Sequence, residues 1–264
     1  MTYERKKRLR YLENLLNQKV ELSVKDIAEL LHVSDMTVRR DLDELEEQGI
    51  VRRTHGGAVH LDPVSHLKEP YIPGEQTTKN AREKNLIGLK AASLIQPHET
   101  IFLDSGTTTP YIAKHLDSEI PITVLCYTIT NLLELYPRDH VNLILLGGYF
   151  HRDSNIFHSI ENRTLISNTR ADKAFISTGG LDPPLGLTTY FYNEADIKRE
   201  MIRSARQIIL VADSTKFGQI SVTHFADLTD IDTIITDNGV SDEYREILAE
   251  REIELIIADQ EPNS

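Results

Sequence analysis

The chain has 264 residues, of which 40% are hydrophobic, and it carries a formal net charge of −12. No apolar run reaches the length of about 18 residues that a membrane-spanning helix needs, and the single cysteine excludes an internal disulfide. The N-terminal segment is charged and has no apolar signal-peptide core. We therefore expect a cytoplasmic protein with no membrane partner.

The acidic charge is unevenly distributed along the chain. Residues 1–60 contain eleven Lys or Arg and eleven Asp or Glu, so the whole net charge lies in residues 61–264. Basic side chains gather at residues 5–10 and flank residues 41–47, which hold five acids. A local basic surface can bind phosphate although the protein as a whole is acidic. The composition is therefore compatible with a nucleic-acid partner.

A first helix is predicted at about residues 3–16, followed by a pair of helices with helix-turn-helix spacing. The pair begins with a helix at residues 24–31, capped by Ser23, and only two residues separate it from a second helix capped by Ser34. The second helix buries Val38, Leu42 and Leu45, which recur at i, i+4 and i+7. In a helix-turn-helix, the N-terminal side chains of this second helix enter the DNA major groove.

A β-hairpin is predicted directly after the second helix. Gly49 suits the position after a helix C-terminus, residues 50–53 and 58–60 read as strands, and residues 54–57 read as the turn between them. This hairpin would be the wing of a winged helix-turn-helix. The basic cluster at residues 5–10 would contact the DNA backbone. The predicted DNA contacts are Ser34, Met36, Thr37, Arg39, Arg40, Arg52, Arg53 and His55.

Short helix pairs also occur as packing or dimerisation units, but the wing with paired arginines and the N-terminal basic cluster favour DNA binding. The first domain is therefore predicted at residues 1–60. Residues 61–76 are rich in proline, lack apolar periodicity and read as a linker. A second domain is predicted at residues 77–264.

The second domain alternates apolar runs with amphipathic segments, which predicts an α/β fold with a mostly parallel sheet and helices on both faces. Strands are predicted at 100–103, 122–125, 141–146, 173–177, 208–212, 233–236 and 254–257. Helices are predicted at 79–95, 109–115, 130–135, 194–204 and 242–250.

A ligand site is predicted where these strands end, since open α/β sheets bind ligands at the carboxyl ends of their strands. Residues 104–108 read Asp-Ser-Gly-Thr-Thr before a helix, which is suited to a phosphate, and Asp, Lys and Gly follow other strands. The predicted effector-binding residues are Asp104, Ser105, Gly106, Thr107, Thr108, Tyr127, Gly147, Gly148, Gly179, Gly180, Glu194, Lys198, Asp213 and Lys216.

Simpler interpretations exist for several of these residues. The Gly-Gly pairs can be plain turns, Glu194 and Lys198 can be a solvated helix ion pair, and Lys216 can be a surface lysine. Cys126 follows an apolar run and is expected to be a packed residue. The histidines show no metal-ligand spacing, so we expect no metal. We also expect no cofactor and no catalytic residue.

Several segments of the sequence resemble the DeoR family of bacterial transcription regulators, and the resemblance covers nearly the whole chain. The matching segments are residues 30–42, 51–58, 101–108, 147–148, 178–180 and 213–218. The resemblance implies an α/β sugar-isomerase-like sensor domain that binds a phosphorylated sugar or polyol. It also implies binding to operator DNA as a homo-oligomer, dimer or higher, usually as a repressor.

Two departures from the common family pattern bear on the effector. The chain reads Cys-Tyr-Thr at 126–128 and has no glycine at 151–157. Together with residues 107–110, Cys126-Tyr127 and residues 155–157 resemble the deoxyribonucleoside-catabolism branch of the family. Deoxyribose 5-phosphate is therefore the leading effector, with Phe157 or Tyr127 as an apolar lining for the missing hydroxyl.

Three alternatives remain open from the sequence. The sensor fold implied by the resemblance is shared with sugar-phosphate isomerases, so an isomerase-like enzyme is one. A regulator that activates transcription is the second. A different sugar-phosphate, polyol or unphosphorylated sugar effector is the third.

Overall fold

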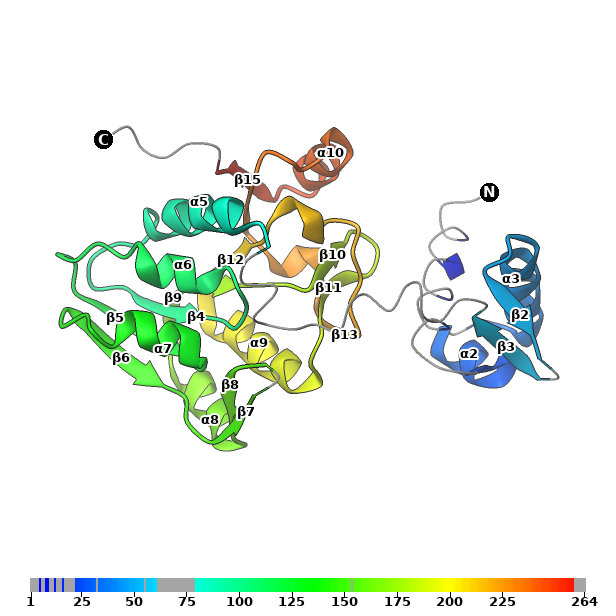
Figure 1. The fold of residues 1–264 in the computed structure, drawn as a ribbon, viewed down its shortest axis with the longest axis horizontal. Coiled ribbons are helices and arrows are strands. Elements are labelled where there is room, and N and C mark those ends of the chain that lie inside the picture. The colour runs from blue at the N-terminus through cyan, green and yellow to red at the C-terminus, as the bar shows by residue number, and fades with distance from the viewer. Residues whose placement is uncertain are drawn as a thin grey trace. The chain divides into compact units, whose positions relative to one another are not determined.

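The computed structural model describes residues 5, 8, 9, 12, 16, 22–31, 33–54, 56–60, 79–152 and 154–258. His55, the predicted linker at 61–76 and most of the predicted first helix lie outside these residues. The chain divides into two compact units, residues 1–71 and 72–264. Each unit is described by itself, with elements labelled as in Figure 1.

The first unit is a winged helix-turn-helix, as predicted. Helix α2 (Val24–Leu31) is followed by helix α3 (Asp35–Glu47), and the strands order as β1 (Leu22–Ser23), β3 (Gly57–His60) and β2 (Val51–Arg53). Strands β2 and β3 pair antiparallel as the wing, while the β1–β3 pairing was not predicted. The structure describes five residues of the predicted first helix, and all are helical: Arg5, Arg8, Leu9, Leu12 and Leu16.

The sequence pattern explains why this unit folds as it does. Ser34 caps α3, because its hydroxyl accepts a hydrogen bond from the Thr37 amide at 3.3 Å. Val38, Leu42 and Leu45 are fully buried on the inner face of α3, as their spacing predicted. They share one hydrophobic core with leucines of the first helix and with Ile27 of α2. Helix α3 therefore packs on this core through one face, and its other face lies on the surface.

The second unit is built around a seven-stranded sheet with the order β15-β14-β12-β9-β4-β5-β6. Every neighbouring pair in this sheet is parallel. All seven predicted strands are present, with ends that shift by at most a few residues. They are β4 (Thr100–Leu103), β5 (Ile122–Cys126), β6 (Val141–Leu145), β9 (Ala171–Ile176), β12 (Ala205–Val211), β14 (Thr233–Thr236) and β15 (Glu254–Ile257).

Helices cover both faces of this sheet, as predicted for parallel strands that are apolar on both sides. One core joins Ile101 and Leu103 of β4 to α5 (Ala81–Ala92), α6 (Thr109–Lys114) and α7 (Ile129–Leu135). The other core takes Phe102 of the same strand and includes residues of α8 (Glu161–Asn168), α9 (Tyr192–Ser204) and α10 (Asp242–Glu250). Alternate residues of one strand thus enter the two cores.

Several short elements were not predicted. Besides α8, these are the hairpin β7 (Tyr149–His151) and β8 (Ile156–His158), and a small antiparallel sheet of β10 (Gly180–Asp182), β11 (Gly186–Thr189) and β13 (Thr223–Ala226). Two single-turn helices, η1 (Ser214–Lys216) and η2 (Leu228–Asp230), complete the unit. In the part of the chain that the structure describes, no helix combines the length and apolarity needed to cross a membrane.

Close packing of α5 on α6 depends on one glycine. A Cβ placed on Gly88 would lie 2.4 Å from Tyr111 Cβ and 2.6 Å from the Tyr111 carbonyl carbon, which is backbone and cannot move aside easily. We predict that Gly88→Ala lowers the free energy of unfolding of the second unit by about 1–3 kcal/mol, because overpacking forces the helices apart. Urea denaturation followed by circular dichroism measures this change.

Gly147→Ala is the matched control, since a Cβ there meets nothing within 4 Å. Equal denaturation midpoints for the two variants would show that α5 and α6 are not packed as described.

Candidate DNA-binding and effector-binding sites

The N-terminal turns of α3 present the side chains that were predicted to contact DNA. Arg39 and Arg40 are exposed, and the Met36 side chain is 63% exposed. Ser34 is also exposed, and its hydroxyl lies 2.9 Å from that of Thr37. The surface of the first unit therefore offers two guanidinium groups beside a methionine at the start of the second helix.

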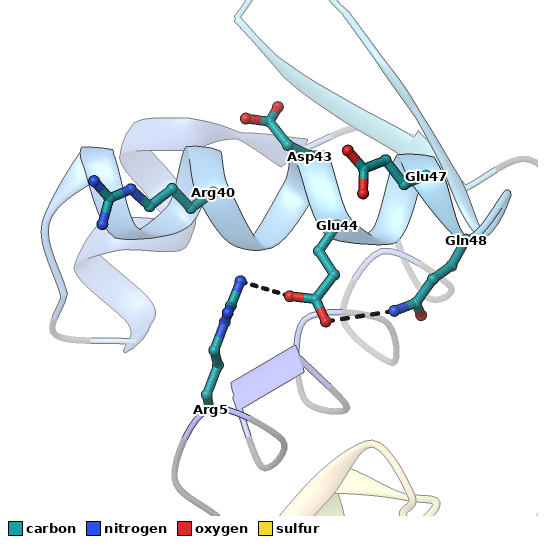
Figure 2. Close-up of a pocket in the computed structure, with 6 residues that line it drawn as sticks. All are labelled: Arg5, Arg40, Asp43, Glu44, Glu47 and Gln48. Atoms are coloured by element: carbon teal, nitrogen blue, oxygen red, sulfur yellow. Dashed lines mark hydrogen bonds and ion pairs between the residues drawn. The ribbon is translucent and has the colours of Figure 1, made fainter. Parts of the chain in front are cut away.

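Two acidic residues of α3 are paired with arginines of the first helix. Arg8 makes a bidentate ion pair with Asp41, which is 1% exposed, and Arg5 Nη2 lies 2.6 Å from a Glu44 oxygen. Figure 2 shows Arg5 and Gln48 meeting at Glu44, while Arg40 points away from the acidic group. Arg5 and Arg8, predicted as part of a cluster that contacts the DNA backbone, thus fasten the first helix to α3.

The two wing arginines differ in their surroundings. The Arg53 amide donates to Glu46 Oε1 at 2.8 Å, and the Arg53 guanidinium pairs with Asp43. Arg53 therefore ties the wing to α3. Arg52, by contrast, is exposed. The two were predicted together as DNA contacts, and the structure leaves Arg52 the freer of the pair.

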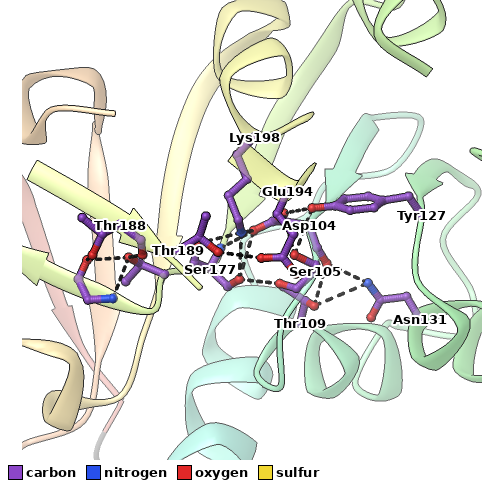
Figure 3. A network of polar contacts seen from close by, with 12 residues as sticks. Asp104, Ser105, Thr109, Tyr127, Asn131, Ser177, Thr188, Thr189, Glu194 and Lys198 are labelled. Carbon is purple, nitrogen blue, oxygen red and sulfur yellow. Dashed lines mark hydrogen bonds and ion pairs between the residues drawn. The ribbon is translucent and has the colours of Figure 1, made fainter. Parts of the chain in front are cut away.

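Asp104 is the centre of a buried polar network in the second unit (Figure 3). It follows β4, and the neighbouring strands β9 and β5 bring Ser177 and Tyr127 to it. The Ser177 amide donates to Asp104 Oδ2 at 2.8 Å, and the Tyr127 hydroxyl donates to Oδ1. Lys198 of α9 pairs with Oδ2 as well and also donates to the Ser177 carbonyl at 3.1 Å.

This network is closed to solvent. Asp104 is 0% exposed and Lys198 is 1% exposed, and both oxygens of Asp104 accept bonds from protein donors. Burial, reinforced by the Asp104 charge, raises the pKa of the Tyr127 phenol well above its usual range. Asp104 and Lys198 therefore lie inside the protein at the predicted site. Tyr127 is buried with them, bonded through its hydroxyl to Asp104, and it offers no exposed apolar surface to a ligand.

Glu194 lies on the same helix as Lys198 but has a different partner. Thr189 Oγ1 donates to Glu194 Oε2 at 2.6 Å, and the side chain is buried. Burial raises the pKa of Glu194, and the positive charge of Lys198 opposes this shift. The simpler interpretation of Glu194 and Lys198 as a solvated ion pair is wrong, because both side chains lie inside the protein.

The loop at residues 105–108 has the features expected of an anion cradle. The hydrogen bonds of the described residues include none donated by the amides of Ser105, Gly106 or Thr107. Gly106 has φ +113°, and a Cβ there would lie 2.5 Å from Ser177 Oγ, so the loop needs glycine at this position. Gly106 and Thr107 are half-buried, which leaves part of the loop accessible. Loop amides beside hydroxyl groups suit a phosphate.

A second charged group lies at the same edge of the sheet, two strands away from Asp104. Asp213 follows β12 and is 2% exposed, and Lys216 lies on η1. Lys84 of α5 is buried close to both, and burial lowers its pKa to about 8, with Asp213 opposing and Lys216 reinforcing the shift. Since neighbouring strands are about 4.8 Å apart, the two groups are separated by roughly 10 Å.

The predicted glycines fall into two classes. Gly147 and Gly148 follow the edge strand β6 and are exposed. Gly179 and Gly180 are buried, and a Cβ on Gly180 would lie 2.2 Å from the Gln219 carbonyl oxygen. The structure thus gives the second pair a packing reason for being glycine and places the first pair away from the Asp104 network.

Sequence reasoning missed Ser177, Asn131, Thr189, Asn80 and Lys84. Asn131 donates to the Asp104 carbonyl at 2.9 Å. Only Lys84 carried a usable signal, since it lies three residues before Ile87 and seven before Ala91 on the buried stripe of its helix. Cys126 is buried, as expected, and no three His, Cys, Asp or Glu side chains among the described residues are grouped to hold a metal.

Comparison with known proteins places the two units of the chain in a family. Residues 8–64 match the DeoR-like helix-turn-helix domain, and residues 79–238 match the DeoR C-terminal sensor domain. The chain is 33% identical to the deoxyribose operon repressor of Escherichia coli K12, over 97% of this chain and 100% of the relative. It is 34% identical to the HTH-type transcriptional repressor GlcR of Bacillus subtilis, over 96% of each chain.

Solved structures give weaker likenesses. A D-ribose-5-phosphate isomerase in complex with phospho-erythronic acid has a TM-score of 0.39 at 18% identity, covering 52% of this chain and 54% of the isomerase. The eIF2B delta structure from Chaetomium thermophilum has a TM-score of 0.43 at 12% identity, covering 60% and 56%. The two matching domains and the full-length relatives assign the family: the chain belongs to the DeoR family of helix-turn-helix transcriptional repressors.

Proposed function

We propose that this repressor binds operator DNA through the first turns of α3 and releases it when a phosphorylated sugar binds the second unit. The observation that carries the DNA half is the exposed Arg39–Arg40 pair, on a helix where Asp41 and Glu44 are paired with Arg8 and Arg5 of the first helix. Arginine is the commonest reader of guanine in the major groove, and both residues are in reach of a groove in a helix-turn-helix.

The remaining DNA contacts are assigned by position. Ser34, Met36, Thr37 and Arg52 lie on the surface of the same unit, and His55 belongs to the wing sequence. Arg53 is assigned a supporting role, since its guanidinium holds the wing against Asp43. Because helix-turn-helix proteins bind paired half-sites as dimers, the proposal includes a homo-oligomer of two or more copies.

The proposed effector-binding site is formed by residues at the edge of the sheet where the strands end. The amides and hydroxyls of residues 105–108 would hold the phosphate, while Lys84 and Lys216 supply positive charge from the Asp213 side. Glu194, buried beside Thr189, would accept a hydrogen bond from a sugar hydroxyl. Both groups lie at the same edge of the sheet, so the charges of Lys84 and Lys216 would attract the phosphate held at residues 105–108.

Deoxyribose 5-phosphate is the leading effector. Supporting this choice are the strings at 107–110, 126–127 and 155–157 and the relative named deoxyribose operon repressor, which this chain matches along its whole length. Phe157 packs on Phe150 and is half-buried, so it remains the candidate for an apolar lining. A relative of similar identity is named for a putative aga operon, so a thermal-shift screen against a panel of sugar phosphates is the direct test.

An isomerase activity is disfavoured by the state of Asp104. A general base needs a free lone pair directed at its substrate, and both oxygens of Asp104 are occupied by Tyr127, Ser177 and Lys198. An isomerase assay with pentose phosphates separates this alternative from a regulator. For release of DNA, the effector must bind the non-operator arrangement more tightly than the operator-bound one.

Arg40→Ala is predicted to weaken operator binding by about 10- to 100-fold, because one good arginine–base contact discriminates by roughly 1–3 kcal/mol. Fluorescence anisotropy with operator DNA at fixed salt measures the affinity. Arg206→Ala is the control, since Arg206 is 85% exposed on the second unit. An unchanged affinity for Arg40→Ala would remove Arg40 from the proposed interface.

Sugar-phosphate binding is predicted to take up a proton at Lys84. With a pKa of about 8, Lys84 is largely neutral above that pH, and a bound phosphate dianion raises the pKa and restores the charge. Affinity should therefore fall as pH rises from 8 towards 10. Calorimetry with deoxyribose 5-phosphate at pH 8.5, in buffers of different ionisation enthalpy, measures the uptake.

Lys84→Met should abolish this proton uptake and weaken binding, whereas Lys90→Met, an exposed lysine on the same helix, should change neither. Equal proton uptake by wild type and Lys84→Met would place the phosphate elsewhere. Lys216→Ala should likewise lose sugar-phosphate affinity while DNA binding stays intact.

A further inference from the structure

Asn80 adopts an unusual conformation immediately before α5. Its backbone is left-handed, with φ 53° and ψ 37°, and its side chain makes no capping bond to the helix. Asparagine at this position usually caps the helix with its side-chain oxygen from an extended backbone. The side chain of Asn80 is therefore committed to something other than helix capping.

The Asn80 side chain instead contacts residues of the proposed effector site. Asn80 Nδ2 donates to Asp213 Oδ1 at 3.0 Å and lies 3.4 Å from Thr215 Oγ1. The same Asp213 oxygen accepts the Thr215 amide at 3.2 Å and caps η1, the turn that carries Lys216. A side chain from one end of the second unit thus holds the loop that presents a proposed effector lysine.

The backbone of Asn80 is linked to the other proposed lysine. The Lys84 amide donates to the Asn80 carbonyl at 2.9 Å, as the first hydrogen bond of α5. The Lys84 side chain then lies near Asp213 and Lys216. Asn80 is therefore bonded through its side chain to one half of the charged group and through its backbone to the other.

Asn80 directly precedes α5, the first helix described in the second unit, on the side of the chain that leads towards the DNA-binding unit. Its φ and ψ set the direction in which Lys79 joins α5. An anion that attracts Lys84 competes with Asp213 for that ammonium group, so it changes how firmly Asp213 holds Asn80. Effector occupancy and chain direction thus depend on one shared carboxylate.

We infer that Asn80 couples the effector site to the DNA-binding unit, through its bond to Asp213. This inference rests on the proposed function and adds the residue that transmits it. Coupling is a ratio: the operator dissociation constant with saturating effector divided by that without it. The role of Asn80 is to set this ratio. Its side chain need not contact DNA or sugar for either ligand to bind.

Asn80→Gly is the decisive variant, because glycine keeps the left-handed backbone at no steric cost and removes only the amide. Asn80→Asp keeps the shape of the side chain but places a second carboxylate against Asp213. Full-length variants would be titrated with operator DNA by anisotropy, with and without saturating deoxyribose 5-phosphate. Asn142→Ala is the matched control, since Asn142 also donates to a threonine hydroxyl, Thr123 Oγ1 at 3.3 Å, on the edge strand.

Wild type and Asn142→Ala should show a ratio of at least fivefold, the lower end of ordinary allosteric coupling, expected to be about 5- to 150-fold. Asn80→Gly and Asn80→Asp should bring the ratio to within about twofold of one, with effector-free operator affinity within about threefold of wild type. A wild-type ratio retained in Asn80→Gly would overturn the inference, as would loss of operator binding without effector. Failure of the proposed function looks different, because wild type itself would then show a ratio of one.

Discussion

The second unit depends on one buried ion pair, between Asp104 at the end of the interior strand β4 and Lys198 on α9. Removing either partner would leave an uncompensated charge in the interior, at a cost of about 3–5 kcal/mol. The desolvation of both ions is offset only because Ser177 and Tyr127 complete the bonding of the carboxylate. The Asp104 carboxylate therefore joins three strand ends and a helix. The loop at 105–108 directly follows Asp104, so these contacts fix its position.

The first unit resolves the conflict between an acidic protein and an anionic partner. Three acids of α3 are paired within the unit: Asp41 and Glu44 with arginines of the first helix, and Asp43 with Arg53. Arginines predicted to grip DNA are thereby used to neutralise the recognition helix. Arg39 and Arg40 stay exposed in its N-terminal turns together with Asp35, and the acidity of residues 61–264 opposes non-specific binding to DNA.

The helix-turn-helix, the wing and all seven strands of the main sheet were predictable, because periodic apolar residues and caps leave one local solution. The short hairpin at 149–158 and helix α8 were not, since their residues alternate weakly and tertiary contacts decide their structure. In the candidate site, strand ends located Asp104 and Asp213, but the direction of each side chain depends on its packing. Tyr127, predicted as a lining residue, therefore turned out to be part of the interior.

The lone thiol of this protein has a practical consequence. Cys126 is fully buried at the end of β5, and burial raises its pKa to about 12. Since only the thiolate reacts with maleimides and oxidants, the native protein should be inert to both at neutral pH. Cysteines introduced on the two units could then be dye-labelled without first removing the native one. The distance between the DNA-binding unit and the second unit could then be measured in solution by energy transfer.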